Sequence, residues 1–242
     1  YTSQYTLSLH DALPISTRPG SSYVEAEEER DRVVPVVEVI RNESDVPISV
    51  DTRKRSVAEA AMAVGADMIN DVSALRDDPE LAAFIADEQI PIVLMHMRGT
   101  PQTMQKNPQY VDTVGEVQRE LAQFVDQALA SGIKRTQIIV DPGIGFGKTV
   151  ADNLRLIRSI DAFRMLGYPI LLGASRKSFI GKTLDAQQRG SDERLAGTLA
   201  VHAYAIMHGV EIIRAHDVQE TIDVRRMLTA IAEADQTGAG EQ

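Results

Sequence analysis

Residues 137–149 read "QIIVDPGIGFGKT", an apolar run that ends in a carboxylate and continues into a glycine-rich turn. The segment comes close to a nucleotide-binding P-loop, which needs a glycine five positions before its final Gly-Lys so that backbone N–H groups can hold phosphates. Pro142 occupies that position, and proline has no N–H and a fixed φ angle. We therefore interpret the segment as a short strand with Asp141 at its carboxyl end, followed by a tight turn.

The same kind of strand recurs along the chain from residue 46 onward. Short β-branched runs alternate with longer helical patterns, and this rhythm is typical of βα units around a parallel sheet. The predicted strands are residues 46–50, 67–70, 91–95, 137–140, 169–173 and 211–215. A closed (β/α)₈ barrel needs two more strands than these six.

Helix start signals separate the predicted strands. They are Asp78 with Pro79, Thr113 with Glu116, and Asp217 with Glu220. Residues 24–42 also read as a helix, which Pro35 would bend. The acidic run at residues 25–32 is most simply a solvated helix face.

Composition limits the classes of function. With 242 residues, of which 43% are hydrophobic, the chain is long enough for one large α/β domain. It contains no apolar run of about 18 residues, so we expect no membrane span. A net charge of −10 argues against a general binder of nucleic acid or anionic membranes. The chain has no cysteine, which fits a cytoplasmic location and excludes thiolate chemistry.

Polar residues follow nearly every predicted strand, at the edge where parallel βα arrays bind ligands. They are Asp51, Thr52, Asn70, Asp71, His96, Asp141, Ser175, Arg176, Lys177, Arg214 and His216. Helix capping would account for Thr52, Asp71 and Asp217, but it does not require the cations Lys177, Arg214 and His216. The last two are two residues apart on one predicted strand, hence on one face. The pattern predicts a small polar ligand with an anionic arm.

Three further histidines are assigned no role in chemistry. His96 lies between two methionines, and such a histidine is more often packed or hydrogen-bonded than a metal ligand. His202 and His208 fall within or at the end of a predicted helix, and the sequence offers neither of them a partner. We interpret all three as structural residues.

Seven segments, in the same order, resemble the dihydropteroate synthase family, the folate-pathway enzymes that sulfonamides inhibit. They are "STRPGS" (16–21), "SVDTRK" (49–54), "MINDVSAL" (68–75), "LMHMRGTPQTMQ" (94–105), "DPGIGFGK" (141–148), "SRKSFIG" (175–181) and "IIRAHDV" (212–218). The resemblance implies a (β/α)₈ barrel that joins 4-aminobenzoate to 6-hydroxymethyl-7,8-dihydropterin pyrophosphate. Pyrophosphate is thought to leave first, and the amine then captures a cation on the pterin's exocyclic methylene.

The resemblance also implies roles for individual residues. For the pterin these are Asp51, Asn70, Asp141 and Lys177. For the pyrophosphate they are Thr17, Arg18, Arg214 and His216, and for the aminobenzoate Pro19, Phe146, Lys177 and Ser178. A homodimer that uses the last helices is implied as well.

The chain departs from the family pattern at its N-terminus. The family's first strand, first helix and second strand are not found, nor is the asparagine-bearing loop that binds Mg²⁺, so we assign no metal ligand although Mg²⁺ is the implied cofactor. Residues 1–15 resemble translated adapter sequence, residues 16–234 form the expected pterin-binding barrel of about six strands, and residues 235–242 form a frayed tail. An open barrel of this kind would be unstable, and its activity impaired.

Two other functions stay open. A pterin-binding barrel that transfers methyl groups from a folate to a corrinoid would share the fold, but "STRPG" and "SRKS" argue against it. A non-catalytic pterin-binding fragment would show pterin affinity without turnover.

Overall fold

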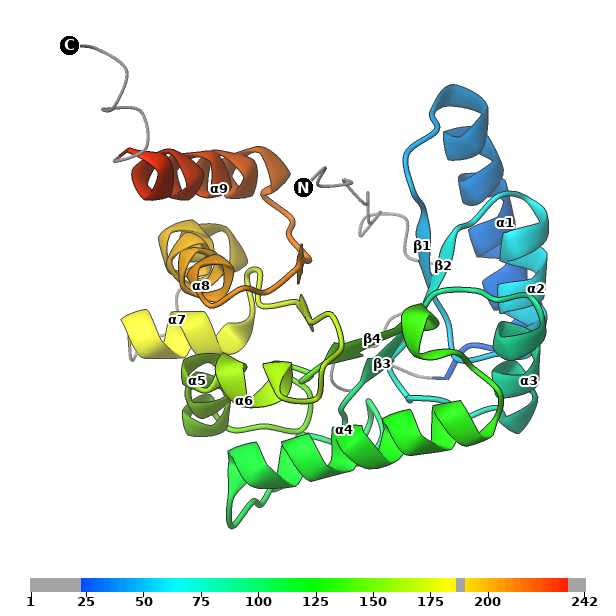
Figure 1. Ribbon diagram of the computed structural model, residues 1–242, viewed down its shortest axis with the longest axis horizontal. Coiled ribbons are helices and arrows are strands. Elements are labelled where there is room, and N and C mark those ends of the chain that lie inside the picture. Colours follow the sequence, from blue (N-terminus) through cyan, green and yellow to red (C-terminus); the bar gives the residue numbers. More distant parts are fainter. Residues whose placement is uncertain (1–22, 186–189, 235–242) are drawn as a thin grey trace.

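The computed structural model describes residues 23–185 and 190–234 of the chain (Figure 1). The expectations for residues 1–15 and 235–242 therefore concern segments outside the described residues. The same is true of Thr17, Arg18 and Pro19.

Six short parallel strands form the centre of the described structure. They are β1 (Ser49–Asp51), β2 (Met68–Asp71), β3 (Ile92–Met95), β4 (Ile138–Asp141), β5 (Leu171–Leu172) and β6 (Ile212–Ile213). β1 to β4 pair in chain order, β5 pairs with β6, and a bridge between Val140 and Ile170 joins the two sets. Every strand lies within or overlaps a predicted one, and the parallel order follows the expected βα rhythm.

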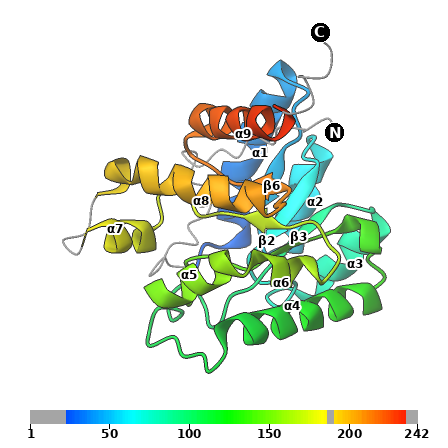
Figure 2. The same ribbon diagram turned by 60° about the vertical axis from the view of Figure 1, so that its left-hand side comes forward.

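Helices surround the strands (Figures 1 and 2). They are α1 (Ala26–Glu43), α2 (Arg55–Ala63), α3 (Pro79–Asp87), α4 (Thr113–Ala130), α5 (Val150–Arg158), α6 (Ile160–Arg164), α7 (Ser178–Leu184), α8 (Leu195–Met207) and α9 (Val218–Glu233). Two short 3₁₀ helices, η1 (Arg135–Gln137) and η2 (Ser191–Arg194), complete the connections. In the described part of the chain, no strand pairs with the outer edge of β1 or of β6, so this part is an open arc of a (β/α) barrel.

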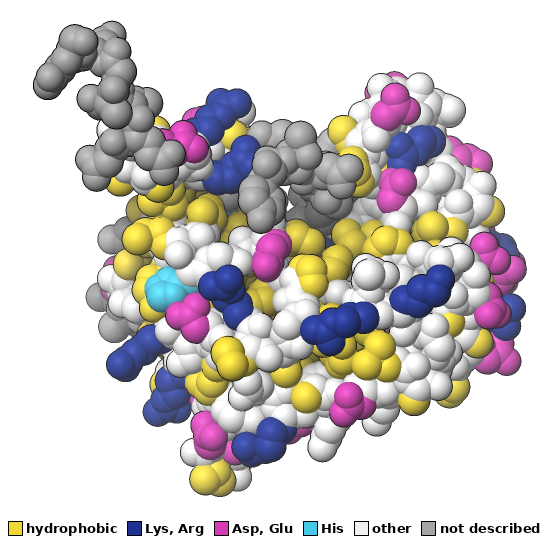
Figure 3. Space-filling view, in the orientation of Figure 1, with side chains coloured by type: hydrophobic (Ala, Val, Ile, Leu, Met, Phe, Trp, Pro, Cys, Tyr) yellow, Lys and Arg dark blue, Asp and Glu magenta, His cyan; other side chains and the backbone are white. Residues whose placement is uncertain are grey.

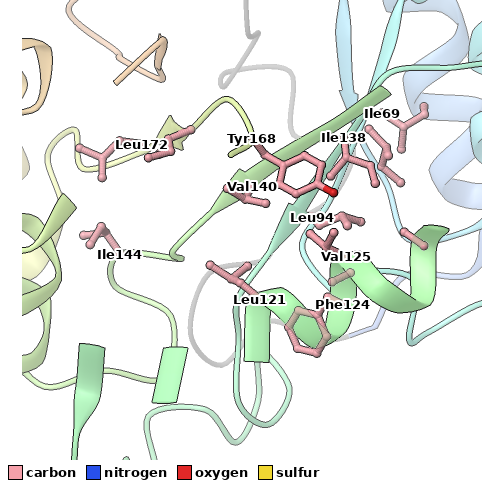
Figure 4. Close-up of a cluster of buried hydrophobic side chains, with 14 of the residues drawn as sticks. Ile69, Leu94, Leu121, Phe124, Val125, Ile138, Val140, Ile144, Tyr168 and Leu172 are labelled. Carbon is pink, nitrogen blue, oxygen red and sulfur yellow. The ribbon is translucent and has the colours of Figure 1, made fainter. Parts of the chain in front are cut away.

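The parallel register gives the sheet an apolar outer face. Val50 pairs with Ile69, Ile69 with Ile92, and Leu94 with Val140, so these side chains share one face because alternate residues of a strand point the same way. All five are buried. Figure 4 labels three of them, Ile69, Leu94 and Val140, together with Leu121, Phe124 and Val125 of α4 and the neighbouring buried residues Ile138, Ile144, Tyr168 and Leu172.

The same register gathers polar side chains on the inner face. Asp51 is the Cα partner of Asn70, and Asp141 is the partner of Met95. Asn70 and Met95 share a face because Asn70 pairs with Val93, two residues before Met95 on the same strand. The carboxyl ends of β1, β2 and β4 therefore present Asp51, Asn70 and Asp141 on one surface.

The helix start at Asp78 is confirmed. Its side chain accepts a hydrogen bond from Glu80 N, and Pro79 is the first helical residue. The predicted cap of α9 is different, because Asp217 holds the cap position without a side-chain capping bond. Its carboxylate instead pairs with Arg176, which is a stronger partner than a backbone N–H.

The predicted start of α4 was wrong by one residue. Asp112 is the cap, and its side chain accepts a hydrogen bond from Gly115 N. Thr113 is buried and donates to Asp152 Oδ1 at 2.6 Å instead. Glu116 completes the arrangement, since its carboxylate accepts the N–H groups of Val111 and Asp112 at 2.8 Å.

The acidic run at residues 25–32 is not solvated throughout. Glu29 is only 1% exposed on the inner side of α1, where its carboxylate accepts hydrogen bonds from Lys54 Nζ and from Thr52 Oγ1. Lys54 is also buried and donates to Val24 O at 2.7 Å. This buried ion pair fastens the start of α1 to the segment that follows Asp51.

Replacing Glu29 by alanine should lower the free energy of unfolding by about 3–5 kcal/mol, because it leaves Lys54 buried without its counter-charge. Urea unfolding curves measure the change. The control is Glu28→Ala on the exposed side of the same helix, which should cost no more than about 0.5 kcal/mol. Equal midpoints for the two variants would contradict the structural role of the pair.

Candidate functional site

Asp51, Asn70 and Arg214 meet at the mouth of the arc. Asn70 Nδ2 donates to Asp51 Oδ1 at 2.8 Å, as their strand pairing requires. Arg214 follows β6 and donates from Nη2 to Asp51 Oδ2 at 2.5 Å. This ion pair connects the two outermost described strands across the inner face. Both side chains stay about one quarter exposed, so a ligand can reach them.

Asn70 has one polar atom without a partner among the described residues. Its side chain is buried, and its Oδ1 atom accepts no hydrogen bond. A buried acceptor that is left unpaired costs free energy, and that cost is removed when a bound molecule donates a hydrogen bond to it. The amide oxygen is therefore suited to accept an N–H group of a bound molecule.

Asp141 ends β4 as a buried carboxylate. Its Oδ1 atom accepts the N–H of Gly143 at 2.7 Å, so the carboxylate also shapes the start of the following turn. Burial raises the pKa of Asp141, whereas the nearby cations Lys177, Lys148 and Arg214 act in the opposite direction. Three cations around one buried carboxylate favour its ionised form, which can accept two parallel hydrogen bonds.

Lys177 lies against the glycine turn. Its ammonium group donates to Ile144 O and sits 4.6 Å from the centre of the Phe146 ring. Burial lowers its pKa to about 8, opposed by Asp141. Gly145 has a φ of 84°, and a Cβ atom there would come within 2.8 Å of the Lys177 side chain. Glycine at this position lets the lysine pass close to the turn.

Phe146 and Ser178 flank Lys177. Phe146 is half-buried and packs against a small apolar cluster of Val72, Met95, Met97 and Met104. Ser178 is the exposed first residue of α7. Of the two, Phe146 has its ring beside the Lys177 ammonium group, and Ser178 follows Lys177 in the chain.

His216 does not share a strand face with Arg214 as the sequence suggested. β6 ends at Ile213, so both residues lie in the segment after it. The His216 imidazole lies 2.9 Å from Ser175 Oγ through its Nδ1 atom, and its backbone N–H donates to the same hydroxyl. Arg214 turns toward Asp51, so the two side chains are arranged by different partners.

Lys148 shows that the glycine turn is not a P-loop. The side chain is only 3% exposed, and its ammonium group lies 2.9 Å from Phe146 O and 3.0 Å from His96 Nδ1. Burial lowers its pKa to about 7. In a P-loop the lysine would reach toward phosphates, whereas this one is folded beneath its own turn.

The three histidines assigned no chemical role are hydrogen-bonded within the fold. His96 Nε2 lies 2.9 Å from Glu120 Oε2, and Glu120 also pairs with Arg98. His202 lies 3.0 Å from Thr221 Oγ1, and His208 lies 3.0 Å from Asp161 Oδ2. These partners are on other helices, so local sequence did not reveal them.

Five of the eight predicted site residues that the structure describes therefore converge. Asp51, Asn70, Asp141, Lys177 and Arg214 are linked by hydrogen bonds or by direct electrostatic interaction. Sequence reasoning missed Ser175 as the partner of His216 and Lys148 as a charge near Asp141. The signal for Lys148 was its place in the turn, which the P-loop question had already singled out.

Comparisons with known proteins identify the family of this chain. A family described as "Pterin binding enzyme" matches residues 11–216. A curated dihydropteroate synthase from Synechocystis sp. is 44% identical over 216 residues, covering 89% of this chain and 74% of the relative. The enzyme of that name from Escherichia coli (strain K12) is 42% identical over 219 residues, covering 90% and 76%.

Solved structures show the same likeness. A Yersinia pestis dihydropteroate synthase in complex with a sulfonamide drug has a TM-score of 0.86 and 38% identity, covering 90% of this chain and 78% of that one. A Xanthomonas albilineans dihydropteroate synthase with 4-aminobenzoic acid has a TM-score of 0.84 and 41% identity, with coverages of 90% and 76%.

The pKa of His96 should be about 4, well below the ordinary 6.5, because the ring is buried and faces the Lys148 ammonium group. The folded protein then binds fewer protons at this site than the unfolded chain between about pH 6.5 and 4, so stability from this residue is lost as the pH falls through that window. NMR titration of the imidazole nitrogens measures the pKa. Glu120→Gln should lower it further, since Glu120 raises it. A pKa of 6.5 or above would contradict the buried neutral ring.

Proposed function

Because this chain belongs to the dihydropteroate synthase family of pterin-binding enzymes, we propose that its convergent polar side chains bind the pterin and its leaving group. The family's TIM-barrel transferases serve folate biosynthesis and are targets of sulfonamides. The reaction condenses 6-hydroxymethyl-7,8-dihydropterin pyrophosphate with 4-aminobenzoate to give 7,8-dihydropteroate and pyrophosphate. The observation that supports this proposal most directly is that Asp51, Asn70 and Asp141 lie on one inner face of the sheet.

Asp141 and Asn70 are the proposed recognition groups for the pterin ring. The edge of a pterin carries adjacent N–H donors, and a buried carboxylate can accept two of them in parallel. Asp141 is buried and surrounded by cations that favour ionisation, which supports this role. The unpaired Asn70 Oδ1 atom supplies a further acceptor at the same mouth. Asp51, bonded to Asn70, completes the edge.

Lys177 is proposed to stand between the two substrates. Its ammonium group interacts electrostatically with Asp141 and lies over the Phe146 ring. One cation therefore borders both the proposed pterin position and the proposed aminobenzoate position. Phe146 offers an apolar ring face to the benzoate, and Ser178 offers an exposed hydroxyl beside it. Pro19, outside the described residues, is proposed for the same position.

Arg214 and His216 are proposed to hold the pyrophosphate. Arg214 presents a planar guanidinium suited to phosphate oxygens, and its present partner Asp51 leaves it partly exposed. His216 is exposed and held in place by Ser175. Thr17 and Arg18, which lie outside the described residues, are proposed to contact the same group.

The chemistry needs charge stabilisation more than proton transfer. The bond between the pterin methylene carbon and the pyrophosphate oxygen breaks, and both electrons leave with the pyrophosphate. The amine nitrogen then forms the new C–N bond and releases a proton to water or to the leaving group. Carboxylates near the ring stabilise the developing positive charge, while Arg214 stabilises the departing pyrophosphate anion.

The described residues do not offer a protein-built Mg²⁺ site. No group of three or more His, Cys, Asp or Glu side chains that could hold a metal occurs within residues 23–185 and 190–234. Mg²⁺ is often bound by one or two carboxylates together with substrate phosphates. The proposed cofactor is therefore a Mg²⁺ ion that binds together with the pyrophosphate of the substrate. We assign no step to it.

A homodimer through the last helices is also proposed. Met207 on α8 and Met227 and Ile231 on α9 are at least 60% exposed, which is high for large apolar side chains. Figure 3 shows apolar side chains gathered in the region of α8 and α9.

None of the described helices is long and apolar enough to cross a membrane. The lack of cysteine supports our proposal of a cytoplasmic location.

The purified chain should release pyrophosphate from the pterin pyrophosphate, with Mg²⁺ present, only when 4-aminobenzoate is added. A coupled pyrophosphate assay measures this release, and chromatography identifies dihydropteroate. Calorimetric binding of the pterin without any release would contradict turnover and favour a pterin-binding role alone. A corrinoid methyltransferase would bind methyltetrahydrofolate without aminobenzoate, which the same calorimeter detects.

Asp141→Asn should reduce kcat/KM for the pterin substrate by about 10²–10³-fold, because the neutral amide cannot accept the paired N–H donors or favour positive charge. Steady-state kinetics measure the loss. The control is Asp126→Asn on the exposed side of α4, which removes the same charge far from the turn and should leave kcat/KM within about twofold. Similar kinetics for the two variants would remove Asp141 from the site.

A further inference from the structure

Lys148 is a buried cation whose donors are all used inside the protein. Its ammonium group contacts Phe146 O at 2.9 Å, His96 Nδ1 at 3.0 Å and His96 O at 3.3 Å. An ammonium group has three N–H donors, so these contacts occupy all of them. Lys148 therefore does not bind a substrate directly, and any role in the reaction must act through its neighbours.

These neighbours hold the glycine turn in one shape. Gly143 has a φ of 68°, and a Cβ atom there would lie 1.9 Å from His96 O, so the turn passes directly over the His96 backbone. Lys148 ties the far side of the turn, at Phe146 O, to the same histidine. His96 is in turn held by Glu120 at 2.9 Å. The turn is thus fastened to β3 from beneath.

The fastened turn carries two groups of the proposed site. Ile144 O accepts the hydrogen bond from the Lys177 ammonium group, and Phe146 lies 4.6 Å from that ammonium group. Asp141 begins the turn through its bond with Gly143 N. A change in the shape of the turn would therefore move groups that contact both substrates.

The charge of Lys148 also acts on Asp141. The interaction works in both directions, since the carboxylate raises the pKa of Lys148 and the ammonium group lowers that of Asp141. The other charged groups that act on either of the two are Lys177, Arg214, Glu120 and Arg98. Lys148 is one of two lysines that face this carboxylate, and it is the one with no group left for a ligand.

We propose that Lys148 is a positioning residue for pterin binding, which fixes the turn at residues 142–147 from beneath the site. The proposal rests on the proposed function, because Asp141 is taken as the pterin acceptor. It assigns a role in the reaction to a lysine that contacts neither substrate.

The test compares Lys148→Met and Lys148→Gln with Lys134→Met in the full chain. Methionine removes both charge and donors, glutamine removes the charge and keeps two donors, and Lys134 is an exposed lysine bonded to Gln89. The probe is 6-hydroxymethyl-7,8-dihydropterin, which lacks the ionisable pyrophosphate. Calorimetry gives its Kd across the pH range, and thermal melting shows whether each variant folds.

Both Lys148 variants should bind the probe at least about tenfold more weakly at neutral pH, with glutamine the milder change. The loss of affinity on acidification should begin at a higher pH in both variants, because Asp141 loses a cation that favours its ionised form. Lys134→Met should keep the wild-type profile. Wild-type affinity for the probe in a folded Lys148 variant would overturn the proposal.

The remaining outcomes are equally decisive. If neither Lys148 variant folds, the residue serves folding rather than positioning, and the proposal fails. If the wild-type chain binds the probe but does not release pyrophosphate, the proposed function fails while the binding profiles still test Lys148. The two failures are therefore distinguishable.

Discussion

The parallel register of β1 to β4 is the constraint on which the rest of the structure depends. Because alternate residues of a strand face opposite sides, one register places Val50, Ile69 and Val140 against the helices and Asp51, Asn70 and Asp141 on the other face. A slip of one residue in any pairing would exchange the two sets. Core packing and the proposed binding site are thus determined together, and the apolar face that stabilises the fold also keeps the polar face in place.

The site balances buried carboxylates against cations from distant parts of the chain. Asp141 at the end of β4 is faced by Lys148, Lys177 and Arg214, while Asp51 at the end of β1 is paired with Arg214. Burying charged side chains costs desolvation free energy, which is offset only when each charge has an oppositely charged partner. For the proposed reaction, which separates a pterin cation from pyrophosphate, the same arrangement would provide preformed charges of both signs.

Strand positions were readable from sequence because short β-branched runs bounded by turn residues favour strands over helices, as "QIIVD" before a glycine-rich turn shows. Helix ends were less certain because neighbouring residues compete for one role. Asp112 caps α4 instead of Thr113, since Thr113 bonds to Asp152, 39 residues away. The prediction that Glu29 is solvated was wrong because its partner Lys54 lies 25 residues further along the chain.

Local sequence was sufficient for the strands, for the polar residues at their carboxyl ends and for the family, because β-branched runs and motif order are properties of neighbouring residues. The partners of those residues came only from the tertiary structure. Arg214 meets Asp51 across 163 residues, and Lys148 meets His96 across 52. Hydrogen bonding, burial and pKa depend on distances through space, and those distances exist only once the strands have paired and the helices have covered them.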